Sequence, residues 1–153
     1  MTHRSRLVVL LLPLLLVGIA PAAWAGAAED VAEVMKQRAQ WGNEGNVDAI
    51  LNTYADNAVL TAARAGLRFE GKEAIRTFLT RLWQVYPNRM TIGRHSMTRF
   101  YANETVAVVN SYGDQYFVDR SGQVSTGTIR TSVMLVKTGG KWLVVDQHNS
   151  RMP

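Results

Sequence analysis

The sequence contains no cysteine, so it forms no disulfide and has no cysteine to hold a metal or a lipid anchor. Of its three histidines, only His95 and His148 lie beyond residue 25. No metal-ligand set, nucleophile–histidine pattern or phosphate-binding loop is present. The net charge of +5 is scattered without a basic run, which argues against nucleic acid as a partner. We therefore expect a domain held together by packing, with no cofactor and no metal.

Residues 1–25 have the pattern of a secretory signal peptide. Arg4 and Arg6 give a positive start, residues 7–20 are apolar, and Ala-Trp-Ala at 23–25 fits the small-x-small cleavage rule. The apolar run of about 14 residues is shorter than the roughly 20 that cross a bilayer. We expect the mature protein to be periplasmic or secreted, with no stable membrane anchor after cleavage.

Residues 26–153 read as one domain, because no repeat, linker or low-complexity segment divides them. Helical spacing of apolar residues predicts helices at 27–41, 47–54 and 72–86. Between the last two we expect a short strand at 58–61 and a loop at 62–69. Alternating patterns predict four strands, at 91–101, 105–118, 124–137 and 142–150. Three helices followed by an antiparallel meander indicate an α+β fold with the helices on one face of the sheet.

The turns of this meander set an expected strand register. A two-residue turn at Gly139-Gly140 pairs His148 with Thr131, and a turn centred on residues 121–122 pairs Tyr112 with Thr131. The more apolar face is assigned to the helices, although a slip of one residue would exchange the faces. This face comprises Val106, Val108, Asn110, Tyr112, Asp114, Ile129, Thr131, Val133, Leu135, Trp142, Val144, Asp146 and His148. The other comprises Ser111, Gly113, Gln115, Arg130, Ser132, Met134, Gln147 and Asn149.

Two groups on the inward face are candidate catalytic residues. His148, beside Asp146 on the same strand, has the arrangement of a general base oriented by a carboxylate. Its alternative is an ordinary histidine that closes the floor of a pocket. Asp114 lies in mid-strand, where burial would raise the pKa of its carboxyl and let it move a proton next to a carbonyl. Its alternative is a water-exposed position at a bulge or sheet edge.

The remaining candidates are pocket-lining residues. Trp41, Tyr54 and Tyr112 are suited to an aromatic pocket for a flat apolar ligand, with core packing as the alternative. Asn110 and Asp146 share the inward face with them. Arg130 would face inward only in the other register, where it would hold an anion.

Three segments carry a resemblance to a known family. They are Gly71 with Arg76 and Leu82-Trp83, the spacing from Gly122 to Trp142, and the run Val145-Asp146-Gln147-His148-Asn149-Ser150 ending at Pro153. The chain resembles the nuclear transport factor 2-like superfamily, and within it SnoaL-like proteins of the SgcJ/EcaC type and the association (hub) domain of calcium/calmodulin-dependent kinase. The resemblance implies a cone-shaped fold, with helices lining a curved antiparallel sheet, a pocket at the wide end and a dimer. Two positions that hold pocket arginines in hub domains are Val133 and Asn149 here.

Three functions follow as hypotheses. The first is an exported small-molecule-binding protein with an apolar pocket that carries a few polar groups. The second is an isomerase- or cyclase-like enzyme that acts by proton transfer on an apolar carbonyl compound, with Asp114 or His148 as the base. The third is a dimeric assembly module without a ligand. The expected partners are a small apolar ligand and a second copy of the chain, joined through the outer sheet face.

Overall fold

The computed structural model describes residues 22–63 and 66–153. The predicted signal peptide lies outside the described residues except for residues 22–25, which begin the first helix. The described helices are α1 (Ala22–Glu44), α2 (Val47–Leu51) and α3 (Lys72–Val85). The described strands are β1 (Tyr54–Ala62), β2 (Leu67–Glu70), β3 (Asn88–Tyr101), β4 (Val106–Val118), β5 (Val124–Thr138) and β6 (Lys141–Arg151).

The six described strands form one sheet in the order β2-β1-β6-β5-β4-β3. The α+β class and the four-stranded meander are as expected, with strand ends shifted by at most three residues. The strand expected at 58–61 is present as part of the longer β1, and β2 follows it, so that a β1–β2 hairpin stands between α2 and α3. The loop expected at 62–69 contains β2, which pairs antiparallel with β1. The helix expected to reach Tyr54 ends at Leu51, since the carbonyl of Thr53 accepts from the Val144 amide (2.8 Å) and draws the chain into the sheet.

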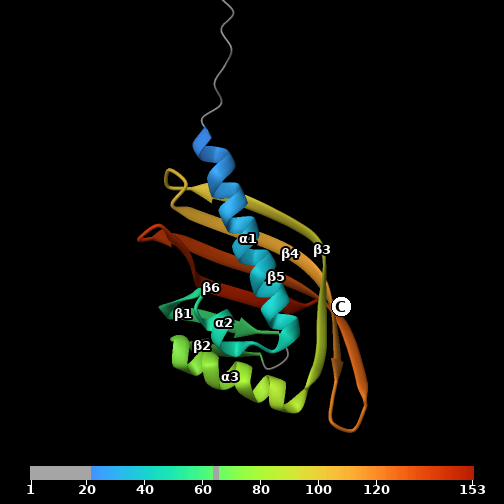
Figure 1. Cartoon of the computed structure of the whole chain (residues 1–153). Helices are drawn as coiled ribbons and strands as arrows, with labels where there is room; N and C mark the ends of the chain where they lie inside the picture. Colours follow the sequence, from blue (N-terminus) through green and yellow to red (C-terminus); the bar gives the residue numbers. More distant parts are fainter. Residues whose placement is uncertain (1–21, 64–65) are drawn as a thin grey trace, which may run out of the picture.

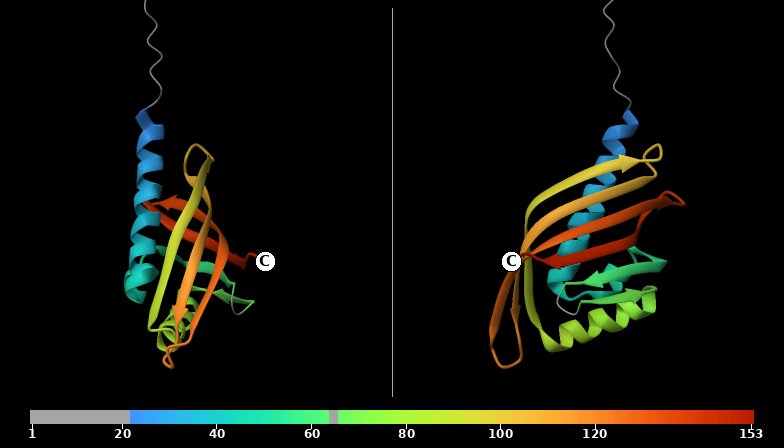
Figure 2. Two further views of the ribbon diagram at one scale, coloured as in Figure 1. Left: turned by 90° about the vertical axis from the view of Figure 1, so that its right-hand side faces the viewer. Right: turned by 180° about the vertical axis from the view of Figure 1, so that it is seen from behind.

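The sheet is strongly curved, and α1 crosses its concave face (Figures 1 and 2). Helices α2 and α3 lie at the end of the sheet formed by β1 and β2 (Figure 1). Burial of apolar side chains between these layers is the main stabilising contribution, at about 25 cal/mol per Å². The largest fully buried side chains are Val31, Leu51, Leu60, Ile75, Val109, Val133, Leu135 and Val144.

The local sequence explains where α2 and α3 begin and end. The side chain of Asn46 caps α2 by accepting from the Ala49 amide (3.1 Å). Gly71 adopts the positive φ of 79° that turns the chain out of β2 into α3. The apolar stripe of α3 buries Ile75 and Leu79 against the core, and Pro87 follows the end of the helix.

The expected register of β4 against β5 is wrong by one residue. Ser111, not Tyr112, pairs with Thr131, because the connecting loop has five residues centred on Ser121 rather than an even number. The Asp119 carboxylate stabilises this loop by accepting from the amides of Ser121 (2.8 Å) and Gln123 (3.0 Å). One face of β4 is exchanged for the other as a result. The inward residues are Ala107, Val109, Ser111, Gly113, Gln115 and Phe117.

The register of β5 against β6 is correct only up to the pair Leu135–Val144. Beyond it, Val145 is an extra residue, and the next pair is Met134–Asp146. Such a β-bulge places two residues of one strand opposite one of the other and bends the strand. The bulge turns the rest of β6 over, so that Gln147 faces inward where His148 was expected.

Candidate functional site

A cavity of about 230 Å³ lies between the helices and the concave face of the sheet. Its walls come from α1, α2, α3, β1 and the four meander strands. The apolar part is built mainly from Ile50, Leu60, Phe78, Leu79, Leu82, Trp83, Phe117, Ile129 and Val133. The polar part is built from Arg38, Asn43, Tyr54, Arg89, Thr91, Gln115, Thr131, Gln147 and Asn149. A largely apolar wall with a few converging polar groups is typical of small-molecule sites.

One polar cluster in the cavity is centred on Gln147. Its Oε1 atom accepts from Nη2 of Arg38 (2.7 Å) and from the hydroxyl of Tyr54 (2.6 Å). Arg38 also donates to Oγ1 of Thr53, and its guanidinium lies 4.5 Å from the centre of the Tyr54 ring. These contacts satisfy a cation and a phenol that would be costly to bury alone. They join α1 to β1 and β6 at this side of the cavity.

The cluster continues along β6 to Asn149. Oδ1 of Asn149 accepts from Oγ1 of Thr131 (2.9 Å) and from Nε2 of Gln147 (3.3 Å). A row of neutral hydrogen-bonding groups therefore crosses the floor of the cavity from β6 to β5.

A second cation lies on the β3 side of the cavity. The guanidinium carbon of Arg89 is 3.9 Å from the centre of the Trp83 ring and 5.4 Å from that of Phe117. The Nε and Nη1 atoms of Arg89 are shielded from solvent. Nearby, Asn43 at the end of α1 receives the Thr91 amide (2.8 Å) on Oδ1 and donates Nδ2 to the Thr91 carbonyl (3.3 Å). This reciprocal pair fixes the helix end against β3 beside Arg89.

The described part of the cavity lining contains no carboxylate and no imidazole. It does contain two guanidinium groups, from Arg38 and Arg89. No group of three or more histidine, cysteine or acidic residues that would suit a metal ion is found among residues 22–63 and 66–153. In those same ranges no helix has the length and apolar character to cross a membrane. The lining offers hydrogen bonds and positive charge, but no side chain that titrates near neutral pH.

Of the residues expected in the pocket, Tyr54 lines the cavity, and its side chain is buried. Trp41 packs against the hydrophobic core but is not part of the described cavity lining. Trp41 lies on α1 as its helical spacing predicted, whereas Tyr54 begins β1 and does not end a helix.

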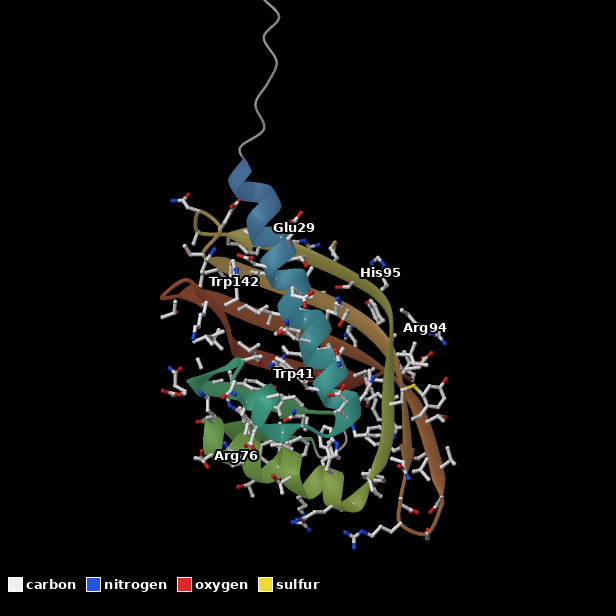
Figure 3. All side chains as sticks on the ribbon, in the orientation of Figure 1. Glu29, Trp41, Arg76, Arg94, His95 and Trp142 are labelled. Carbon is white, nitrogen blue, oxygen red and sulfur yellow. The ribbon has the colours of Figure 1, made fainter. Side chains whose placement is uncertain are left out.

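The expected inward positions of Asp114 and His148 are wrong. Asp114 faces outward because of the β4 register, and it is bound by Nε of Arg94 (2.5 Å) and Oγ1 of Thr128 (3.0 Å). His148 faces outward because of the Val145 bulge and is exposed. Figure 3 shows Arg94 projecting from β3 on the side away from α1.

The same two causes move the other expected lining residues. Asn110 and Tyr112 turn outward with Asp114 on β4, and Asn110 accepts a hydrogen bond from the Ser132 hydroxyl (2.8 Å). Asp146 turns outward with His148 on β6 and is exposed. Arg130 is exposed on the outer face, as the expected register required, and it is not part of the described cavity lining.

Sequence reasoning missed the two arginines of the lining. Arg38 had a readable signal, because it occupies a position in the apolar stripe of α1 between Met35 and Trp41. An arginine in a buried stripe indicates a partner on the facing strands. Arg89 had no such signal, because it precedes residue 91, where the alternation of apolar and polar residues predicted the strand to begin.

Comparison with known proteins assigns the class. The fold is an α+β fold with helices on the concave face of a curved sheet, and residues 31–153 match the family model described as a SnoaL-like domain. The chain therefore belongs to the SnoaL-like family. No match is found among curated proteins.

Solved structures with the same fold carry different descriptions. One from Xanthomonas campestris, described as a calcium/calmodulin-dependent protein kinase II association domain, has a TM-score of 0.73 and 21% identity over 82% of this chain and 88% of its own. A nuclear transport factor 2-like protein from Salmonella enterica has a TM-score of 0.77 and 16% identity over 85% and 94%. One from Novosphingobium aromaticivorans, described as a scytalone dehydratase, has a TM-score of 0.76 and 12% identity over 84% and 86%. The TM-scores show that these proteins share the fold of this chain.

Proposed function

We propose that the protein is an exported small-molecule-binding protein whose ligand occupies the cavity on the concave face of the sheet. The observation that carries the proposal is the cavity itself, with apolar walls and an ordered row of hydrogen-bonding groups from Arg38 to Asn149. Its volume of about 230 Å³ is below the roughly 300 Å³ at which pockets for drug-sized ligands begin. The ligand is therefore a small molecule of one or two rings.

The cavity favours binding over the two alternative functions. A proton-transfer enzyme, which the scytalone dehydratase neighbour suggests, needs an acid or base in contact with its substrate. The described lining has no carboxylate or imidazole for this role, because Asp114 and His148 face outward. An assembly module without a ligand has no need of an open cavity, and a core filled by side chains would be more stable.

The proposal is tested with a neutral two-ring probe, 2-acetylnaphthalene, and one pair of variants on β5. Val133→Phe adds bulk to the cavity wall, whereas Met134→Phe adds it to the exposed outer face. We expect the probe to bind the wild type and Met134→Phe equally by titration calorimetry. We expect Val133→Phe to lose at least about tenfold in affinity, which is about 1.4 kcal/mol. Absence of binding to the wild type, or equal binding to Val133→Phe, would overturn the proposal.

We also propose that the protein forms a homodimer through the outer face of the sheet. Large apolar side chains are exposed there, and Met90 on β3 directly faces Tyr116 on β4, with Ile92 beside them. Clustered exposed apolar residues mark interaction surfaces. A second copy is the occupant we infer, since a two-fold axis lets one such patch cover its own equivalent.

Sedimentation equilibrium of Ile92→Asp tests the dimer. We expect a dimer for the wild type and a monomer for this variant, because a carboxylate would be placed in the interface. Leu67→Asp is the matched control, since Leu67 is equally apolar and exposed but lies on β2 at the far edge of the sheet. A monomeric wild type, or a variant that remains dimeric, would contradict this interface.

A further inference from the structure

We infer that the cavity recognises an uncharged ligand through one acceptor oxygen, such as a ketone carbonyl, and that Nδ2 of Asn149 donates a hydrogen bond to that oxygen. This inference rests on the proposed binding function and goes further by naming the chemical class of the ligand and the residue that recognises it. Three features support it: the fixed direction of the hydrogen bonds that lead to Asn149, the open donor at their end, and the apolar lining around it.

The hydrogen bonds between Arg38 and Asn149 can run in one direction only. A guanidinium has donors but no acceptor, so the Gln147 atom that receives Arg38 must be the oxygen Oε1 (2.7 Å). The amide nitrogen of Gln147 is then the end that meets Asn149 (3.3 Å), and because this nitrogen donates, it meets the oxygen Oδ1. The hydroxyl of Thr131 donates to the same oxygen (2.9 Å). Arg38 therefore determines the orientation of both amides in series.

An open donor stands at the end of this chain of hydrogen bonds. Nδ2 of Asn149 makes no hydrogen bond to residues 22–63 or 66–153, and it is not one of their atoms that are shielded from solvent. Asn149 itself lines the cavity. Each hydrogen bond in a chain polarises the next, so the charge of Arg38 strengthens the donor at the far end. Gln115 also lines the cavity, but no hydrogen bond to the described residues fixes either end of its amide.

The surroundings of Asn149 match an apolar body attached to the acceptor. Its cross-strand partner on β5 is Thr131, and the next residues on the same face of β5 are Ile129 and Val133, which are buried and line the cavity. A carbonyl that leaves water regains a hydrogen bond from the neutral amide, whereas a hydrocarbon leaves that amide without a partner. A carboxylate would lose more hydration than one neutral donor returns. The ligand class is therefore an apolar compound with an uncharged acceptor oxygen.

The experiment compares 2-acetylnaphthalene with 2-isopropenylnaphthalene, a hydrocarbon of nearly the same shape in which a methylene group replaces the carbonyl oxygen. Affinities are measured by equilibrium dialysis for the wild type and Asn149→Asp. This substitution keeps an oxygen that accepts from Thr131 and Gln147, but it replaces the donor Nδ2 with a second acceptor. We expect the wild type to bind the ketone at least as tightly as the hydrocarbon. We expect Asn149→Asp to bind the ketone at least about tenfold more weakly than the hydrocarbon.

The matched control is Asn110→Asp, the same change on the outer face of the sheet. Asn110 accepts a hydrogen bond from the Ser132 hydroxyl, as Asn149 does from that of Thr131, but it lies outside the described cavity lining. This variant should keep the wild-type ratio of the two affinities. The same ratio in Asn149→Asp would overturn the assignment to Asn149.

The wild type separates the ligand class from the binding function. Failure of both probes to bind would overturn the binding function itself. Tighter binding of the hydrocarbon than of the ketone would overturn the acceptor and leave the binding function standing. Tighter binding of 2-naphthoate, the corresponding carboxylate, than of the ketone would overturn the uncharged class.

A measurement on the wild type keeps the assignment testable if Asn149→Asp does not fold. The side-chain amide signals of isotope-labelled protein are followed by NMR during titration with 2-acetylnaphthalene. We expect the Nδ2 protons of Asn149 to shift downfield, as protons do on forming a hydrogen bond, while those of Asn110 stay in place. A shift at Gln115 without one at Asn149 would overturn the assignment.

Discussion

At the residue scale, Gly45 controls how α1 meets α3. It has a φ of 77°, and a Cβ atom there would lie 2.2 Å from Nε1 and 2.3 Å from Cδ1 of Trp83. Left-handed backbone and the close approach of a ring both require glycine. We expect Gly45→Ala to lower the free energy of unfolding by about 1–3 kcal/mol in a urea titration, through backbone strain and displacement of Trp83.

Gly42 supplies the control for that experiment. It lies inside α1, and a Cβ atom there would meet nothing within 4 Å. Gly42→Ala should therefore stabilise the protein by about 0.5–1 kcal/mol, the usual difference between the two residues in a helix. If Gly45→Ala proved as stable as the wild type, the close contact between Gly45 and the Trp83 ring would be wrong.

The site residues show what single positions reveal before the fold is known. Tyr54 was a candidate for an aromatic pocket on the inner face of a helix, and it lines the cavity although it lies on β1 instead. The outward residues Asp114 and His148 were misplaced because their direction depends on register, which no single residue determines. Arg38 was visible in the helical stripe, but its partner Gln147 was not, since that side chain had been assigned to the opposite face.

At the element scale, helices and strands were predictable and their pairing was not. The apolar periods of α3 and of the meander strands are strong local signals. Register instead depends on loop length and bulges: one residue at Ser121 reverses the faces of β4, and one at Val145 reverses the rest of β6. Strand β1 was predicted only in part and β2 not at all, because their pairing with β6 and with each other is not visible in a local window.

The Val145 bulge is tested by two neighbouring residues of β6. Gln147→Ala removes the acceptor shared by Arg38 and Tyr54 and leaves both donors partly buried. We expect it to cost about 1–3 kcal/mol of unfolding free energy. His148→Ala, on the exposed side, should change that free energy by less than about 0.5 kcal/mol. A larger loss of unfolding free energy for His148→Ala than for Gln147→Ala would favour a register without the bulge.

The five-residue loop between β4 and β5 gives a pH-dependent prediction. Hydrogen bonds from Ser121 and from the Gln123 amide hold the pKa of Asp119 below the ordinary value for an aspartate. A pKa lowered by folding contributes stability above the unfolded-state value, and this contribution is lost as pH falls through the folded-state value. We expect Ser121→Ala to raise the pKa of Asp119 in a carboxyl NMR titration.

Two comparisons complete the loop experiment. Ser96→Ala, on the distant strand β3, should leave the pKa of Asp119 unchanged. Asp119→Asn should flatten the dependence of stability on pH in the acid range where Asp119 titrates. An Asp119 pKa that is ordinary in the wild type would argue against the loop geometry and with it the register of β4.

At the scale of the whole molecule, proteins that share this fold are described as having different functions. The neighbours from X. campestris and N. aromaticivorans cover similar shares of this chain, yet one is described as an association domain and the other as a dehydratase. A shared fold determines where helices and strands lie, but it does not determine which functional residues the cavity contains. In this chain the described cavity lining contains arginines and amides but no carboxylate and no imidazole.

The proposed export depends on the position of the cleavage sequence relative to the folded domain. Among the residues whose burial is described, the first buried residue of the core is Ala27, and the family match begins at residue 31. Cleavage after Ala25 would therefore remove none of the described buried side chains, and α1 would keep most of its length. We expect the full chain, expressed in a bacterial host, to appear in the periplasmic fraction with Gly26 as its first residue, measured by intact mass.

The control for export alters the cleavage sequence alone. Ala25→Leu places a large side chain at a position that the cleavage rule reserves for small residues, so the chain should keep residues 1–25 and stay with the membrane fraction. A variant that begins at Gly26 should fold and bind 2-acetylnaphthalene like the cleaved protein, because its cavity lining is unchanged. Recovery of the uncleaved wild type from the cytoplasm would contradict export while leaving the binding site untouched.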